Sequence, residues 1–352
     1  MGCPKVSILW VNFNSIKIID IVLESLRAIK DLNYPNYELI VVDNGSNDGS
    51  YEIIKEYVKK HYGSRAKLIR LYKNLGFCGG NNIAFRVRDP FSKYVVLLNN
   101  DAVPEPDSLK YLIEEMENNP HLGSAQGVII DYHHKYIDTI GGFMDEVSNM
   151  YLALRGFPPS VIRKSLYITY ADGAYSIHRI KAIKKIYKGR EKIFIDETFA
   201  YLDDTLLGLL MWNHDYMVKS FPYIVAKHVR GATFKRLLHI KSLRLYFIIR
   251  NRMVFKEITN SRYKEIFELI IVRRMLSYLI HSSQIRKNWG TIYNKAVKSG
   301  KKLSEKLKSY GIYIDIYKAP IIRVNLSEAA KLIMLTRIFN RDINKRLLNM
   351  IL

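Results

Sequence analysis

The stretch LLNNDAVPEP, residues 97–106, ends an apolar run with two amides and a carboxylate. Asn99, Asn100 and Asp101 directly follow the β-branched and aliphatic segment 94–98. Oxygen ligands suit hard divalent cations, and Mg²⁺ or Mn²⁺ is often held by one or two carboxylates together with substrate phosphates. Such a cation would neutralise a diphosphate leaving group. The stretch therefore predicts a cation site at the end of a strand.

A second pair of carboxylates, Asp203 and Asp204, lies in the segment FIDETFAYLDDTLLGLL. Acidic residues favour the first turn of a helix for electrostatic reasons alone, which is one interpretation of the pair. General-base catalysis is the other, because one of two adjacent carboxylates can have a pKa raised enough to accept a proton near neutral pH. The residues themselves leave both interpretations open.

Three further segments are candidates for ligand contacts, and each has a structural alternative. Asp43 ends an apolar segment ahead of a Gly-rich turn, where Asp commonly bonds backbone amides. NLGFCGGNN, residues 74–82, could bring backbone amides to a phosphate, although a Gly-rich turn without a ligand is more common. His228 suits a phosphate or metal contact, while a lone histidine is more often structural. Lys235 and Arg236 would serve a diphosphate in the same way.

The elements that would position these residues alternate along the first hundred positions. Segments with helical spacing separate apolar strand patterns at 5–12, 37–43, 67–71 and 94–98. This alternation predicts a mostly parallel, Rossmann-like α/β sheet with helices on both faces. Ligands of such sheets bind at the carboxyl ends of the strands. The polar clusters fall at those ends, namely Asn12 and Asn14, Asp43, Asn74, and Asn99 to Asp101.

Beyond the first hundred residues the pattern is less regular. Strands are expected at 122–130 and 216–226 and a helix at 199–213, whereas 131–165 shows no clear period. Amphipathic helices are expected in the last third of the chain, at 240–256, 263–285 and 291–309. We therefore predict a catalytic domain over 1–240 and a basic, mainly helical region over 241–352.

Charge divides the chain at about the same place. Residues 227–352 carry 28 Lys and Arg against 7 Asp and Glu, and the preceding residues carry 27 against 26. A basic region attracts nucleic acid, anionic lipid or phosphorylated ligands, although a Lys-rich solvated tail is the plain alternative. The segment YFIIRNRMVF, residues 246–255, fits an interfacial helix and a helix packed on the α/β domain equally well.

Targeting signals are not evident. Two cysteines, Cys3 and Cys78, are too few for a disulfide framework and indicate a reducing compartment. No charge-free apolar stretch approaches the ~18 residues that span a bilayer. We therefore expect a cytoplasmic protein, peripheral on the inner face of a membrane.

Taken together, the motifs resemble glycosyltransferase family 2, inverting enzymes of the GT-A fold, and particularly its rhamnosyltransferase-like branch. The matching pieces occur in the family's order over about residues 5–255. They are VSILWVNFN, IVVDNGSNDGS, NLGFCGGNN, LLNNDAVPEP, ADGAYSIHR, FIDETFAYLDD, KHVRGAT and YFIIRNR.

The resemblance implies a role for each motif. Asp43 would contact the base or ribose of a nucleoside-diphosphate sugar, and Asp101 would be the main protein ligand of Mg²⁺ or Mn²⁺. Asn99 and His228 would lie beside that metal, and Asp204, paired with Asp203, would be the catalytic base. The other donor-site candidates are Asn12, Asn14, Asn74, Gly76, Gly79, Gly80, Asn81, Asn100 and Gly173.

The chain departs from the family pattern at four positions. Asn99 replaces the first acid of the metal motif, and Asp203 replaces the Glu of the catalytic Glu-Asp pair. Leu206 and Leu210 stand where the branch usually has Asp and Arg. These last two departures affect the expected acceptor site more than the donor site.

The expected reaction is a single displacement in which Asp204 deprotonates an acceptor hydroxyl and a nucleoside diphosphate leaves. A glycan or lipid-linked saccharide is the expected acceptor, and no nucleic-acid partner is expected. One alternative is a nucleotidyltransferase, but the Gly-rich basic loop expected after its first strand reads VNFNSIK here. The other is a nucleic-acid-binding protein, for which the chain has no motif.

Overall fold

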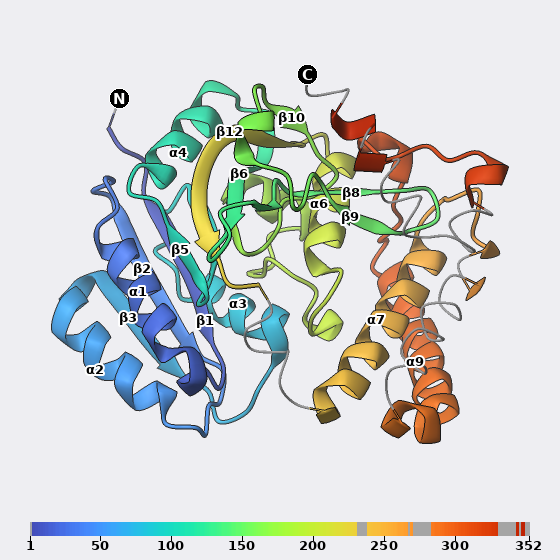
Figure 1. Ribbon diagram of the computed structural model, residues 1–352, viewed down its shortest axis with the longest axis horizontal. Coiled ribbons are helices and arrows are strands. Elements are labelled where there is room, and N and C mark those ends of the chain that lie inside the picture. Colours follow the sequence, from blue (N-terminus) through green and yellow to red (C-terminus); the bar gives the residue numbers. More distant parts are fainter. Residues whose placement is uncertain are drawn as a thin grey trace.

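The computed structural model describes residues 2–230, 238–266, 268–269, 283–329, 343–344 and 346–348. Within these residues, a ten-stranded mixed sheet lies between two layers of helices (Figure 1). The strands of the main sheet follow the spatial order β10-β12-β6-β11-β4-β1-β2-β3, with β5 and β7 attached to β12 and β6, and β8 pairs separately with β9. Their bounds are β1 (Val6–Asn12), β2 (Tyr37–Asp43), β3 (Ala66–Arg70), β4 (Tyr94–Asn99), β5 (Ala102–Pro104), β6 (Leu122–Asp131), β7 (Ile137–Thr139), β8 (Gly142–Met144), β9 (Met150–Leu152), β10 (Leu166–Tyr167), β11 (Tyr175–Arg179) and β12 (Met217–His228).

The helices divide between the two faces because alternate strand residues point to opposite sides. Ile8 and Trp10 of β1 belong to a hydrophobic cluster with α1, α2 and α4, whereas Leu9 belongs to the cluster that contains α3, α5 and α6. The bounds of the helices are α1 (Ile19–Lys30), α2 (Ser50–Tyr62), α3 (Gly76–Arg86), α4 (Ser108–Asn118), α5 (Ile180–Ile186), α6 (Asp203–Asn213), α7 (Leu238–Ile258) and α9 (Ser283–Ser309).

Parallel pairing brings the polar strand ends to one edge of the sheet. In the ladder of β1 with β2, Asn12 stands opposite Asp43, and in the ladder of β1 with β4, Val11 stands opposite Asn99. Antiparallel β11 then pairs with β4, so that the loop before β11 opens beside the same edge. The predicted α/β fold class is confirmed, with the antiparallel strands making the sheet mixed.

Two expected elements differ in detail. The glycines of 74–82 lie inside helix α3 rather than in a loop. Gly80 packs close to Val11, where a Cβ would come within 2.8 Å of a Val11 methyl group, so this position requires a residue without a side chain. The helix expected from 199 begins at Asp203, because Phe199, Tyr201 and Leu202 have positive φ angles. The segment 131–165 contains the short strands β7, β8 and β9.

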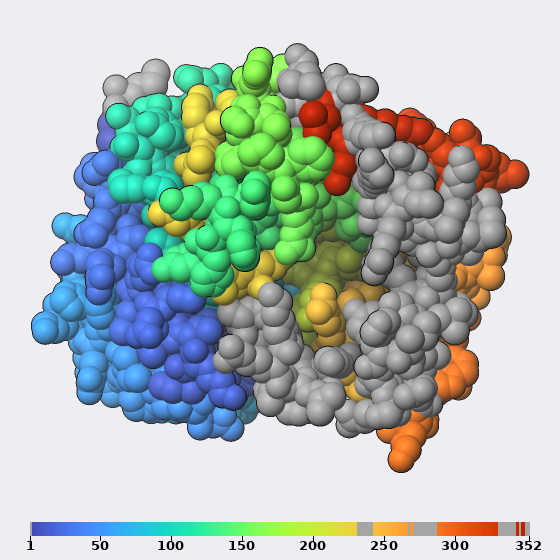
Figure 2. Space-filling model, viewed as in Figure 1, coloured from blue at the N-terminus to red at the C-terminus, as the bar shows by residue number. Residues whose placement is uncertain are grey.

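The described C-terminal helices pack on the sheet domain. Helices α7 and α9 lie side by side at the end of the molecule away from β3 (Figure 1). The visible atoms of α9, in orange, lie along the right-hand edge of Figure 2. Phe247, Ile249 and Phe255 of α7 are buried, so the packed-helix interpretation of 246–255 holds. Most of the helix expected at 263–285 lies outside the described residues. Within the described ranges, no helix combines the length and the apolar character needed to cross a membrane.

Candidate active site

The strand ends of β1 and β2 are tied together by one buried amide. Asn12 donates from Nδ2 to Oδ1 of Asp43 at 2.9 Å and accepts at Oδ1 from Nδ2 of Asn100 at 2.9 Å. The second oxygen of Asp43 accepts from the backbone N–H of Ser46 at 3.0 Å, and Asp43 is fully buried. Asp43 therefore shapes the turn after β2, as its structural alternative predicts, and a contact with the donor stays a prediction. Asn14 accepts from the N–H of Asn47 in the same turn.

A second amide ties this turn to the Gly-rich helix α3. Asn44 donates from Nδ2 to Asn74 Oδ1 at 3.0 Å and to the Gly76 carbonyl at 2.9 Å. Gly76 needs its lack of a side chain, since its φ is +76° and a Cβ would lie 2.4 Å from the carbonyl oxygen of Phe199. Asn81 is buried and donates to the carbonyl of Phe77 within its own helix. Gly79 packs on Leu75, and donor roles for these residues stay predictions.

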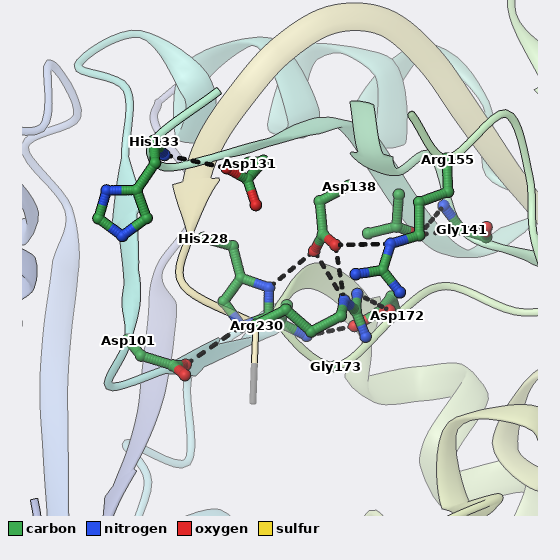
Figure 3. Close-up of polar contacts among 12 residues, drawn as sticks. Asp101, Asp131, His133, Asp138, Gly141, Arg155, Asp172, Gly173, His228 and Arg230 are labelled. Atoms are coloured by element: carbon green, nitrogen blue, oxygen red, sulfur yellow. Dashed lines mark hydrogen bonds and ion pairs between the residues drawn. The ribbon is translucent and has the colours of Figure 1, made fainter. Parts of the chain in front are cut away.

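Asp101, in the predicted cation site, lies next to a histidine, because His228 stands opposite Ala102 in the antiparallel ladder of β5 with β12. Asp101 follows β4, and Oδ1 of its carboxylate lies 3.1 Å from Nε2 of His228, the last residue of β12. On the opposite side of the ring, Nδ1 lies 2.9 Å from Oδ2 of Asp138 in β7 (Figure 3). All three side chains are buried. The histidine therefore bridges two carboxylates.

The network continues through an arginine toward the start of β11. Arg230 donates from Nε to both oxygens of Asp138 at 2.8 Å and from Nη2 to Asp172 at 2.7 Å (Figure 3). Arg155 adds a weaker ion pair with Asp138 at 3.6 Å. The Asp138 carboxylate, which is 1% exposed, thus meets three basic side chains.

Opposite charges set the protonation of this network. Burial alone would lower the pKa of His228, but the carboxylates of Asp101 and Asp138 outweigh it and raise the pKa to about 9. Burial would raise the pKa of Asp138, but the hydrogen bond from His228 and the charge of Arg230 lower it to about 2. At neutral pH the imidazole is therefore charged and donates a hydrogen bond to each carboxylate.

This donor set fits a divalent cation at one position. Histidine ligands of metals usually donate their second ring N–H to a carboxylate, which is what Nδ1 of His228 does with Asp138. Nε2 would have to release its proton for a cation to bind between it and Asp101, so binding would be coupled to proton loss. The described residues contain no group of three or more His, Cys, Asp and Glu placed to hold a metal. A cation here would therefore take most of its ligands from substrate and water, as Mg²⁺ commonly does.

The second carboxylate pair opens helix α6 beside the loop that precedes β11. The N–H of Gly173 donates to Oδ2 of Asp204 at 3.2 Å. Asp203 is 4% exposed, whereas Asp204 is only partly buried. Burial, the adjacent charge of Asp203 and the charge of Asp172 raise the pKa of Asp204 well above its usual range. The pKa of Asp203 is raised as well, chiefly by burial.

The sequence analysis did not identify three residues of this site, and two of its predicted residues lie outside the described part of the chain. Asp138 and Asp172 were not singled out, and neither was Arg230, although KHVRGAT and ADGAYSIHR contain two of the three. Leu206 and Leu210 are buried in the core, so the two departures from the branch pattern serve packing. Lys235 and Arg236 lie outside the described residues. Asn99 ends β4 next to the site, and its place as a ligand stays a prediction.

Comparison with known proteins decides the family. An uncharacterized glycosyltransferase of Methanocaldococcus jannaschii is 31% identical over 248 residues, which cover 70% of this chain and 78% of that protein. The model of glycosyl transferase family 2 matches residues 7–157. The chain belongs to glycosyltransferase family 2. The predicted family and enzyme class are thus confirmed, while the rhamnosyltransferase-like branch stays a prediction.

Two further proteins match over different extents. The poly-β-1,6-N-acetyl-D-glucosamine synthase of Staphylococcus epidermidis is 33% identical over 106 residues, so the match spans 30% of this chain but only about a quarter, 24%, of that protein. The solved mannosyltransferase PcManGT of Pyrobaculum calidifontis, in complex with GDP-Man and Mn²⁺, has a TM-score of 0.52 at 15% identity. That alignment covers 99% of this chain and 85% of the mannosyltransferase, and it establishes likeness of fold.

Proposed function

We propose that this chain transfers a sugar from a nucleoside-diphosphate sugar to an acceptor hydroxyl, with inversion at the anomeric carbon. The observation that carries the proposal is the placement of Asp204, a carboxylate with a raised pKa, beside the same sheet edge as the Asp101–His228 pair. The family supports the donor class, and PcManGT was solved with a nucleotide sugar.

The proposed displacement takes place in a single step. The carboxylate of Asp204 takes the proton of the acceptor hydroxyl while the acceptor oxygen forms its bond to the anomeric carbon. The bond from that carbon to the diphosphate oxygen breaks, and its electron pair leaves with the nucleoside diphosphate. The raised pKa makes Asp204 a stronger base than an ordinary carboxylate. Attack on the face opposite the leaving group inverts the configuration of the anomeric carbon.

The residues toward the diphosphate would hold a divalent cation. Asp101 and His228 are the proposed protein ligands, with Asn99 as a third candidate and Asp138 orienting the histidine. Mg²⁺ or Mn²⁺, when bound, supplies neutralisation of the charge that develops on the leaving diphosphate. Arg230 fixes the position of Asp138 relative to Asp172 by donating to both.

Release of nucleoside diphosphate from a panel of UDP-, GDP- and dTDP-sugars in the presence of Mn²⁺ tests the proposal. The wild-type chain should hydrolyse or transfer one of these donors. Asp204→Asn should lower the rate by about 10²–10⁴-fold, the usual contribution of a general base. Asp101→Ala should weaken metal-dependent turnover. Wild-type rates in both variants would refute the assignment.

The basic region supports a proposal about where the acceptor lies. Helix α9 exposes Lys287, Lys295, Lys298 and Lys302 at helical spacing along one side, and Lys301 beside them. Each basic residue near an anionic bilayer adds roughly 1 kcal/mol of binding free energy. We propose that this lysine face docks on anionic lipid and brings the enzyme to a lipid-linked saccharide acceptor.

A further inference from the structure

The segment that leads into the carboxylate pair has an unusual backbone. Phe199, Tyr201 and Leu202 have φ angles of +63°, +69° and +66°, and none of them is glycine. A side chain in this left-handed region costs roughly 1–3 kcal/mol per residue and persists only when the surroundings impose it. Asp203 follows immediately as the first residue of α6. The direction in which the carboxylate pair faces therefore depends on whatever holds residues 199–202.

Two side chains of α7 hold this segment by its carbonyl groups. Asn251 donates from Nδ2 toward the carbonyls of Thr198, Ala200 and Tyr201 at 3.2, 3.0 and 2.6 Å. Arg250 donates from Nη2 to the carbonyls of residues 197 and 198, both at 2.6 Å. Asn251 is 2% exposed and Arg250 is 7% exposed, so water does not compete for these bonds.

The remaining carbonyl of the segment bonds to the opposite side. The Phe199 carbonyl accepts from the N–H of Cys78 in α3 at 3.1 Å. The Phe199 ring stacks on Phe247 of α7, with ring centroids 4.5 Å apart and planes inclined by 7°. Every carbonyl from Glu197 to Tyr201 thus has a donor from α3 or α7. The segment is fixed between the Gly-rich helix and the helix of the basic region.

We propose that Asn251 and Arg250 are positioning residues for the proposed base, Asp204. They impose the left-handed turn over 199–202, and the turn sets Asp204 against the Gly173 amide. Neither residue touches the base itself. The inference rests on the proposed function for its catalytic part, whereas its structural part is independent of any activity. It gives α7 a role in catalysis, whereas the proposed lipid docking belongs to α9.

The test compares Asn251→Ala with the matched control Asn260→Ala. Asn260 also makes amide hydrogen bonds in the C-terminal region, to Asp315 and Ile316, and it makes none with residues 196–204 among the described contacts. Asn251→Ala should lower kcat by about 10–100-fold, the effect expected when a catalytic group is displaced by about 1 Å. The dissociation constant of UDP or GDP with Mn²⁺ should change by less than about twofold, since the proposed cation ligands Asp101 and His228 make no described hydrogen bond with residues 196–204. Asn260→Ala should leave kcat unchanged.

Hydrogen–deuterium exchange separates this inference from the proposed function. Amides of residues 196–206 should exchange faster in Asn251→Ala than in wild type, while those of β1 and β2 keep their rates. If the wild-type chain transfers no sugar, the proposed function fails. The exchange data then still test whether Asn251 holds the turn at 199–202. Arg250→Lys, which retains the charge without the planar fork, serves if Asn251→Ala does not fold, and it should show the same faster exchange. Unchanged exchange over 196–206, or an unchanged kcat in a folded variant, would overturn the proposal.

Discussion

Asp138 holds the imidazole of His228 from the side opposite Asp101, with Nδ1 of the ring 2.9 Å from Oδ2 of the carboxylate. This contact determines which ring nitrogen faces the proposed cation. A proton kept on Nδ1 by Asp138 leaves Nε2 as the nitrogen that can bind a metal. Asp138 therefore acts on the cation site through its neighbour.

Asp138→Asn should weaken Mn²⁺ binding by about 10–100-fold, the usual cost of removing a carboxylate that orients a ligand histidine. Titration of free Mn²⁺ by electron paramagnetic resonance, with GDP or UDP present, measures this directly. Asp131→Asn is the matched control, since Asp131 bonds only the exposed loop residues His133 and His134 among its described side-chain contacts. Equal Mn²⁺ affinity in the two variants would show that Asp138 has no such role.

Asp203→Asn should move the acid limb of the pH–rate profile to lower pH. Asp203 raises the pKa of Asp204 by its charge and by a hydrogen bond, so an uncharged amide at 203 lets Asp204 lose its proton more readily. The base form is the active form, and activity should therefore persist to lower pH than in wild type. The pH dependence of kcat/KM, which reports the free enzyme, is the measurement. A limb that stays in place or moves upward contradicts the prediction.

Asp204→Asn should stabilise the folded protein at neutral pH while lowering turnover by about 10²–10⁴-fold, as expected for loss of a general base. The pKa of Asp204 is raised on folding, so the native state binds more protons than the unfolded state between the ordinary and the raised pKa. The contribution of Asp204 to stability is therefore complete below its unfolded pKa and is lost as the pH rises through the folded one. The gain at pH 7.5 should be on the order of 1 kcal/mol and should shrink toward pH 4. Urea unfolding at both pH values measures it, and a loss of stability at pH 7.5 would disprove it.

Gly76→Ala should destabilise the protein more than Gly49→Ala. Both glycines have positive φ, +76° and +87°, so both substitutions carry the left-handed cost of roughly 1–2 kcal/mol. A Cβ at 76 would also meet the Phe199 carbonyl at 2.4 Å, whereas a Cβ at 49 meets nothing within 4 Å. The free energies of unfolding from denaturant titration should differ by at least about 1 kcal/mol. Equal losses of unfolding free energy in the two variants would mean that the 199–202 turn moves to accommodate the methyl group without loss of stability.

Cosedimentation with liposomes rich in phosphatidylglycerol tests the lysine face of α9. A triple Lys→Gln variant at 295, 298 and 302 should bind about 100-fold more weakly at 0.1 M salt, given roughly 1 kcal/mol for each residue. Wild-type binding should also fall as salt rises. The control triple, Lys→Gln at 59, 60 and 188, removes the same charge from exposed positions in the sheet domain. Equal effects of the two triples, or no wild-type binding at low salt, would rule out docking through α9.

The sequence by itself determined the sheet and the polar edge. Apolar runs that end in Asn or Asp set the strand ends locally, and parallel pairing necessarily brings such ends together, which is why Asn12, Asp43 and Asp101 were found from their spacing. The pair Asp203–Asp204 was found in the same way, from residue types at the start of a helix.

Only the tertiary structure decided what those residues contact. Asp138 and His228 are 90 positions apart, and Asp138 lies in a segment without hydrophobic period, so no local pattern connects them. The sequence pattern of residues 199–213 predicts a helix, yet the backbone at 199–202 forms a left-handed turn. The carbonyl of Ala200 in this turn accepts a hydrogen bond from Asn251, which lies 51 positions further along the chain. The local conformational preferences of neighbouring residues determine most strands and helices, because these elements form within one continuous stretch of backbone. Side-chain contacts between distant segments override these preferences where they supply the hydrogen bonds that a helix would otherwise make.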